Sequence, residues 1–205
     1  EYLDKLTDTD LNIDAILPKM RFNVAVGQNY FMEMAKMRAY RVLWANIAKA
    51  YGAKEENAKM LIHAFNAQIN MSLYDSYVNM LRTTTGSMSA ILGGVHSFSV
   101  TPFDMVYEPT TEFAERIARN QQLILKEESH FDKVADPAAG SYYIENLTDS
   151  LVKAAWALFL QIQEEGGYLA ALRNGTIQKM VKESATKRLS NVATRREIIL
   201  GTNQY

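Results

Sequence analysis

The sequence predicts an α/β fold built on a parallel sheet. Three short apolar segments, at residues 20–26, 60–65 and 95–100, alternate with two longer segments in which apolar residues recur every three or four positions. The longer segments are long enough to cross the sheet as helices, which parallel strands require. At 205 residues the chain has the length of one domain, and 48% of its residues are hydrophobic, so it can bury a core.

The first strand–helix unit has clear boundaries. The strand at residues 20–26 ends at Gly27, and Asn29 is the expected N-cap of a helix that runs to about residue 50. Gly52 is expected to end this helix, because the position after a helix favours a left-handed backbone. The face that should be buried carries Met37, Tyr40, Trp44 and Ile47.

The pattern then repeats. The second strand, at residues 60–65, is followed by a helix that ends at Gly93 and Gly94, and the third strand, at residues 95–100, is ended by Pro102. The apolar stripe expected to face the sheet from this second helix is Tyr77, Met80, Leu81, Thr84, Met88 and Ile91.

The second half of the chain predicts mainly helices. A charged helix spans 112–128, and a turn-rich loop at 136–140 precedes an amphipathic helix over 147–162. Thr176 is the expected cap of a last helix, and residues 197–200 are expected to form a final short strand. The charged helix should pair its own side chains, and those are Glu112, Glu115, Arg116 and Arg119.

Three strand–helix units are too few for a closed (β/α)₈ barrel, which takes roughly 250 residues. The sheet is therefore either open or the last part of a barrel, and the periodicity alone does not choose. The chain begins at Glu1 rather than Met, which predicts a fragment of a longer protein.

Composition excludes several classes of function. The net charge is −1, which argues against nucleic acid and anionic membranes as partners. The absence of cysteine removes thiol chemistry and suits a reducing cytoplasm. The three histidines, His63, His96 and His130, have no metal-site spacing, and lone histidines on apolar strands are more often core residues than ligands. The residues alone show no strong catalytic constellation.

Four segments, in family order and together spanning most of the chain, resemble the cobalamin-dependent acyl-CoA mutases of the methylmalonyl-CoA mutase family. They are Phe31-Met-Glu-Met-Ala-Lys-Met-Arg-Ala39 with Leu43-Trp44; Arg116-Ile-Ala-Arg-Asn120 with Glu127-Glu-Ser129; Asp136-Pro-Ala-Ala-Gly-Ser-Tyr-Tyr-Ile-Glu145; and Ile199-Leu-Gly-Thr-Asn-Gln-Tyr205.

This resemblance implies a fold. The acyl-CoA domain of the family is a TIM barrel that encloses the CoA chain, and residues 1–205 resemble its C-terminal portion, about three β/α units with extra C-terminal helices that wrap the outside. The family's catalytic Tyr-His pair would lie upstream of Glu1. We expect no cobalamin-binding domain within residues 1–205, because the Asp-x-His-x-x-Gly motif of the family does not occur there, so the resemblance assigns adenosylcobalamin to the whole complex and not to this segment.

The resemblance also marks the positions that contact CoA in this family. This chain has Lys19, Arg21 and Asn23 at those of the first strand, Leu61, His63 and Phe65 at those of the second, and His96 and Ser97 at those of the third. Lys19 keeps a charge without the bidentate fork of arginine, and His63 and Ser97 keep polar groups. We therefore expect residual substrate contacts at Lys19, His63 and Ser97, with no catalytic residue and no metal ligand.

The altered pocket, together with Ala138 where catalytic chains commonly have tryptophan, resembles the small, non-catalytic subunit of the family. The implied function is to support a large catalytic subunit, in a heterodimer that interconverts succinyl-CoA and (R)-methylmalonyl-CoA. Two alternatives stay open: a fragment of a catalytic mutase with altered acyl specificity, and a scaffold without mutase activity. An incomplete barrel leaves a sheet edge and apolar helix faces uncovered, so we expect the chain to self-associate when alone.

Overall fold

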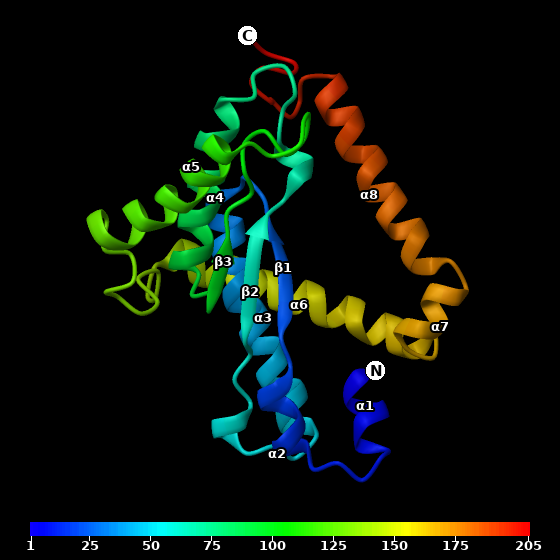
Figure 1. Cartoon of the computed structure of the whole chain (residues 1–205). Coiled ribbons are helices and arrows are strands. Elements are labelled where there is room, and N and C mark those ends of the chain that lie inside the picture. The colour runs from blue at the N-terminus through cyan, green and yellow to red at the C-terminus, as the bar shows by residue number, and fades with distance from the viewer.

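The computed structural model describes residues 1–205, and a three-stranded parallel sheet lies at its centre (Figure 1). The strands β1 (Phe22–Val26), β2 (Ile62–Asn66) and β3 (Ser97–Ser99) are arranged in the order β1-β2-β3. All pairings are parallel, which confirms the predicted α/β class and the three central strands.

Two helices connect the strands and lie behind the sheet in Figure 1. They are α3 (Tyr30–Ala50), between β1 and β2, and α4 (Val78–Leu92), between β2 and β3. The expected stop at Gly52 is confirmed, because this residue has a φ of 75° and directly follows the helix C-cap. The core between the two layers includes Val26, Met37, Trp44, Ile62, Ala64 and Ala90.

The predicted buried stripe of α4 is wrong. Tyr77 and Leu81 are 62% and 66% exposed, whereas the buried face carries small and polar residues. Those buried residues are Asn79, Thr83, Gly86, Ser87, Ser89 and Ala90. The reason is close packing: a Cβ at Gly86 would lie 2.9 Å from the side-chain nitrogen of Asn66, so apolar side chains of ordinary size do not fit there.

The polar groups on this buried face are satisfied within the helix and its neighbours. The hydroxyl of Ser87 donates to the Thr83 carbonyl oxygen at 2.6 Å, and that of Ser89 donates to the Gly86 carbonyl oxygen at 2.8 Å. Local bonding of this kind removes the desolvation penalty that would otherwise exclude hydroxyls from a core.

The remaining elements are helical. Before β1 lie α1 (Tyr2–Thr7), α2 (Ile13–Ile16) and the 3₁₀ turn η1 (Leu17–Lys19), and the crossovers add η2 (Glu55–Asn57) and η3 (Gln68–Asn70). After β3 lie α5 (Glu112–Leu123), the π-helical turn η4 (Ile124–Glu128), α6 (Tyr142–Glu164), α7 (Tyr168–Arg173) and α8 (Thr176–Ala193). None of the helices combines the length and the apolar composition that a membrane crossing needs.

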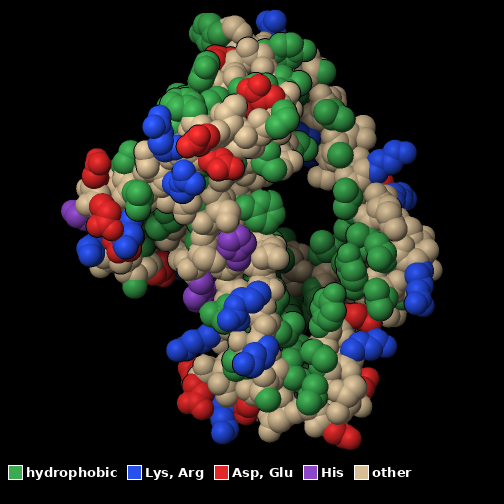
Figure 2. Space-filling view, viewed as in Figure 1, with side chains coloured by type: hydrophobic (Ala, Val, Ile, Leu, Met, Phe, Trp, Pro, Cys, Tyr) green, Lys and Arg blue, Asp and Glu red, His purple; other side chains and the backbone are tan.

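The last helices form an arm that stands away from the sheet. The start of α6 packs against α3 and buries Ile144 and Thr148, whereas α8 buries no residue. In the space-filling view of Figure 2, an opening bordered by hydrophobic side chains remains between the sheet and this arm. The arm therefore adds little to the core of this chain.

Two expectations for the end of the chain are corrected. Residues 197–200 form no strand, because Asn203 folds the segment into a turn by accepting from the Ile199 N–H and donating to the Val192 and Glu197 carbonyl oxygens. The N-cap of α8 is Gly175, not Thr176, since its left-handed backbone lets the chain enter the helix.

The charged face of α5 also differs from the expectation. None of its side chains forms an ion pair with another, and the Arg116 guanidinium lies 5.5 Å from the centroid of the Phe113 ring. Exposed ion pairs contribute little, so an aromatic face can compete for the guanidinium.

The close approach at Gly86 gives a stability prediction. Gly86→Ala should lower the free energy of unfolding by about 1–2 kcal/mol, because the clash with Asn66 outweighs the better helix propensity of alanine. Chemical denaturation of the chain measures this, with Ser150→Ala at an exposed position of α6 as the control. An equally or more stable Gly86→Ala variant would contradict the packing described here.

Candidate functional site

One face of the sheet is not covered by helices, and it is the candidate functional site. Alternate strand residues point to opposite faces, and the set that points toward α3 and α4 forms the core. The other face carries Asn23 and Ala25 from β1, His63 and Phe65 from β2, and Ser97 and Ser99 from β3. Figure 2 views this face, with histidine side chains over the sheet beside the opening.

The register of the strands builds a polar row on this bare face. Asn23 pairs with His63, and His63 pairs with Ser97, so the three side chains lie across the sheet on neighbouring strands. Parallel strands are about 4.8 Å apart, which places each side chain within contact of the next. The next row, of Ala25, Phe65 and Ser99, is mostly apolar.

His63 is held by hydroxyl groups of β3. Its Nδ1 lies 2.8 Å from the Ser97 hydroxyl oxygen, and its Nε2 lies 3.4 Å from the Ser99 hydroxyl oxygen. His63 is half-buried and both serines are exposed. The two predicted site residues His63 and Ser97 are therefore in direct contact.

Lys19, the third predicted residue, does not join this row. It was expected on the first strand, but the structure places it at the end of η1, before β1 begins. Its side chain is exposed and makes no hydrogen bond or ion pair with the bare face. Proline at position 18 favours the start of the short helical turn, so the strand begins later than the apolar pattern suggested.

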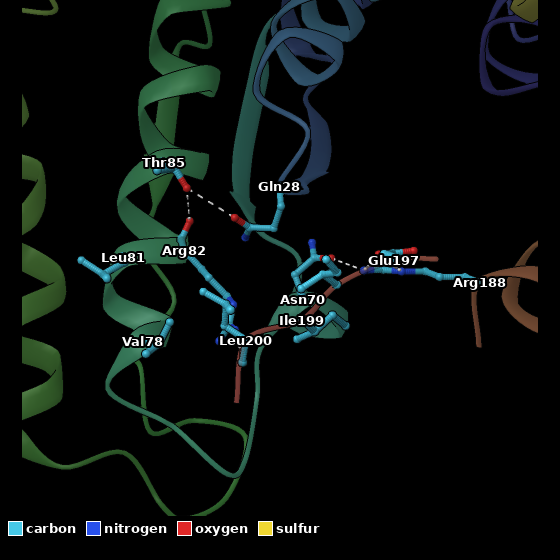
Figure 3. Close-up of a pocket in the computed structure, with 11 residues that line it drawn as sticks. Gln28, Asn70, Val78, Leu81, Arg82, Thr85, Arg188, Glu197, Ile199 and Leu200 are labelled. Atoms are coloured by element: carbon cyan, nitrogen blue, oxygen red, sulfur yellow. Dashed lines mark hydrogen bonds and ion pairs between the residues drawn. The ribbon is translucent and has the colours of Figure 1, made fainter. Parts of the chain in front are cut away.

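Apart from the bare face, a hollow of about 310 Å³ lies at the carboxyl end of the strands (Figure 3). Arg82 of α4 donates to the Leu200 carbonyl oxygen at 2.5 Å and to the Asn79 side-chain oxygen at 2.8 Å. Arg188 of α8 is paired with Glu197 at 3.0 Å and also donates to Asn70. Both guanidiniums are therefore committed to holding residues 197–200 over the sheet.

Sequence reasoning missed this hollow. Arg82 stands in the segment Arg82-Thr-Thr-Thr-Gly-Ser87, whose composition only loosely resembles a phosphate loop, and the structure places it in the middle of α4. Burial lowers the pKa of Arg82, with partial opposition from Asp75. No spacing signal in the sequence connects this arginine with a segment more than a hundred residues later.

Arg38 of α3 joins two of the segments that carry the resemblance. Its guanidinium pairs with Asp136 and, at 2.7 Å, with Glu145, and its side chain is only 12% exposed. The Gly140 N–H also donates to Glu145, at 3.0 Å. These hydrogen bonds, first from Gly140 and then from Arg38, lower the pKa of Glu145. Arg38 thereby fixes the 136–140 loop and the start of α6 against α3.

The structure gives no set of residues for holding a metal ion or a cobalt ligand. It contains no group of three His, Cys, Asp or Glu side chains that could bind a metal. His63 uses both ring nitrogens within the sheet, and His96 Nδ1 accepts from the Ile62 N–H at 3.2 Å. His130 lies in a turn with a φ of 54°. The residues present do not fit a corrin site, and we derive no step through such a group.

The fold and this face define the class of protein. It is an α/β protein with parallel β-α-β-α-β order, one sheet face packed on helices and the other face bare and polar. The chain belongs to the methylmalonyl-CoA mutase family, because the family model described as methylmalonyl-CoA mutase matches residues 1–205.

Individual relatives agree with this family. The chain is 53% identical over 207 residues to "Methylmalonyl-CoA mutase small subunit" of Porphyromonas gingivalis, covering all of this chain and 34% of that protein. It is 40% identical over 205 residues to the protein of the same name from Streptomyces virginiae, covering 33% of it. It is 37% identical over 206 residues to "Methylmalonyl-CoA mutase large subunit" of Porphyromonas gingivalis, covering 29% of it. The chain thus spans about a third of the length of these curated relatives.

Arg38 gives a second stability prediction. Arg38→Ala should lower the free energy of unfolding by about 2 kcal/mol, because it leaves Asp136 and Glu145 without their charged donor. Thermal or chemical unfolding measures this, with the exposed Arg173→Ala as a matched control that should change stability by less than about 0.5 kcal/mol. Equal stabilities of the two variants would show that the anchor contributes nothing.

His96 gives a pH prediction. Burial, together with the guanidiniums of Arg41 and Arg21, holds the pKa of His96 below its ordinary value of 6.5. Unfolded His96 therefore binds a proton at a higher pH than folded His96. The contribution of neutral His96 to the free energy of unfolding is complete above about pH 6.5 and is lost as the pH falls below that value. His96→Asn should show a shallower loss of melting temperature between about pH 7 and pH 5 than the parent chain. Parallel melting curves against pH would contradict the assignment.

Proposed function

We propose that this chain is a segment of the small subunit of methylmalonyl-CoA mutase. The complete enzyme would interconvert succinyl-CoA and (R)-methylmalonyl-CoA by adenosylcobalamin radical chemistry. The support is comparative: the chain is 53% identical to the small subunit of Porphyromonas gingivalis but 37% identical to the large subunit of the same organism.

The three strands and their helices would form the C-terminal portion of a (β/α)₈ barrel, with the bare face directed inward. The parallel order, the helical crossovers and the helices on only one face of the sheet support this. In such a barrel β1 and β3 would each pair with a further strand along its outer edge. The helices α5 to α8 would wrap the outside.

The observation that carries a non-catalytic role is the state of the bare face. Of the three residues expected to keep substrate contacts, Lys19 lies outside the bare face, and His63 is already bonded to Ser97 and Ser99. A bound thioester chain would have to break these bonds or leave its own polar atoms unpaired, at about 1–3 kcal/mol each. Several such losses would weaken CoA binding by orders of magnitude.

The partner in this proposal is a large catalytic subunit, joined to the small subunit as a heterodimer. The adenosylcobalamin of the complex would be held by that partner, since the residues of this chain make no site for it. The contribution of this chain would be structural, through the interface between subunits.

The test is a mutase assay of the full-length protein with adenosylcobalamin and methylmalonyl-CoA, alone and after mixing with the large subunit. The proposal predicts no turnover alone and full turnover in the complex. It also predicts that His63→Ala leaves turnover by the complex within about twofold, because this residue would not contact the reacting substrate.

Robust turnover by the protein alone would overturn the proposal and favour the reading of a catalytic mutase with altered acyl specificity. Failure to associate with any large subunit would instead favour a scaffold without mutase activity. Size-exclusion chromatography of the mixed subunits separates this last outcome from the others.

A further inference from the structure

Ser97 and His63 on the bare face have the geometry of a nucleophile and its base. The Ser97 hydroxyl oxygen lies 2.8 Å from His63 Nδ1, which is ideal hydrogen-bond distance for proton transfer. The two residues are directly opposite each other on neighbouring parallel strands, so the sheet itself fixes their separation. Ser97 is exposed on the bare face, so no side chain of this segment covers its hydroxyl.

A third group orients the base. The Ser99 hydroxyl oxygen lies 3.4 Å from His63 Nε2. In the tautomer in which the Nε2–H donates to Ser99, Nδ1 carries a lone pair and accepts the Ser97 proton. A nucleophile, a base and an orienting group in this order are the usual arrangement for an activated serine.

Asn23 completes the row on the other side of His63. It lies opposite His63 on β1, is exposed, and makes no side-chain hydrogen bond within the chain. Its amide N–H groups are therefore uncommitted donors on the same face. Asn23 lies two strands from Ser97, about 10 Å at the usual strand spacing, so it can contact the far part of a molecule bound on this face but not the carbonyl oxygen at the reacting carbon.

We propose that Ser97 is an acyl-accepting nucleophile activated by His63, acting on short, neutral esters or thioesters. The Ser97 oxygen adds to the acyl carbonyl carbon while His63 Nδ1 takes the hydroxyl proton. The carbon–oxygen or carbon–sulfur bond of the leaving group then breaks, and the leaving group departs with that proton as an alcohol or thiol. Water, with its proton taken by His63, hydrolyses the ester on Ser97 to a carboxylic acid and restores the serine.

The neighbouring side chains set the class of acyl group. The adjacent row offers the apolar side chains of Ala25 and Phe65, which are exposed on the same face. Neither row contains a lysine or arginine to hold a carboxylate, which favours a neutral acyl group. The reaction requires no binding of CoA, so its test does not depend on the mutase function proposed above.

The test uses p-nitrophenyl acetate with the full-length protein. We expect p-nitrophenol release that falls at least tenfold in Ser97→Ala and in His63→Gln, because general-base activation of a nucleophile contributes about 10²–10⁴-fold. Mass spectrometry of the protein quenched during turnover should find acetyl on the peptide that contains Ser97. Ser150→Ala, an exposed serine on α6, is the matched control and should keep the full rate.

The Ser97→Ala variant also distinguishes this mechanism from hydrolysis by the imidazole alone. It keeps His63, so release that persists in this variant would overturn the proposal and assign the reaction to the ring. Acetylation found elsewhere but not at Ser97 would also overturn it. Circular dichroism melting curves of each variant, matched to that of the parent protein, ensure that a lost rate reflects lost chemistry rather than unfolding.

Discussion

The division of the sheet into a covered and a bare face is the constraint on which the rest of the structure depends. Helices α3 and α4 bury Val26, Ile62 and Ala64 on one side, and strand geometry then directs every alternate residue to the other side. A shift of one residue in any strand would bury the polar row and expose the core. The apolar core therefore fixes the register that brings Asn23, His63 and Ser97 into line.

Two close contacts keep the helices in the position that this register needs. Gly86 lets α4 approach the end of β2, and Arg41 of α3 donates to the Gly93 and Gly94 carbonyl oxygens at 2.8 and 3.0 Å. The second contact satisfies carbonyl groups that the end of α4 leaves unpaired, and it links the two crossover helices. Arg38, one turn earlier, fixes the start of α6 by a different contact, its ion pairs with the carboxylates of Asp136 and Glu145.

Much of the fold could be predicted from the sequence, because strand and helix periodicities are local properties. The three strands, both crossover helices and the stop at Gly52 agree with the structure. The buried face of α4 could not be predicted, since it depends on how closely Gly86 approaches another element. The strand predicted at residues 197–200 is a turn, because the hydrogen bonds of this segment come from the side chain of Asn203 rather than from a neighbouring strand.

The site could be predicted in part. The pairing of His63 with Ser97 follows from parallel strands in register, which the order of elements already implied. The place of Lys19 depended on where β1 begins, which the apolar pattern sets only within a few residues. The hollow under Arg82 and Arg188 joins residues from opposite ends of the chain, and only the assembled fold brings them together.

The proposed loss of CoA contacts is measured most directly by calorimetric titration of succinyl-CoA into the full-length protein without its proposed partner. If three contacts are lost or already committed, at about 1.4 kcal/mol each, binding would be about a thousandfold weaker, so micromolar ligand should give no saturable heat. A micromolar dissociation constant would contradict the account and show that the bare face still binds the substrate.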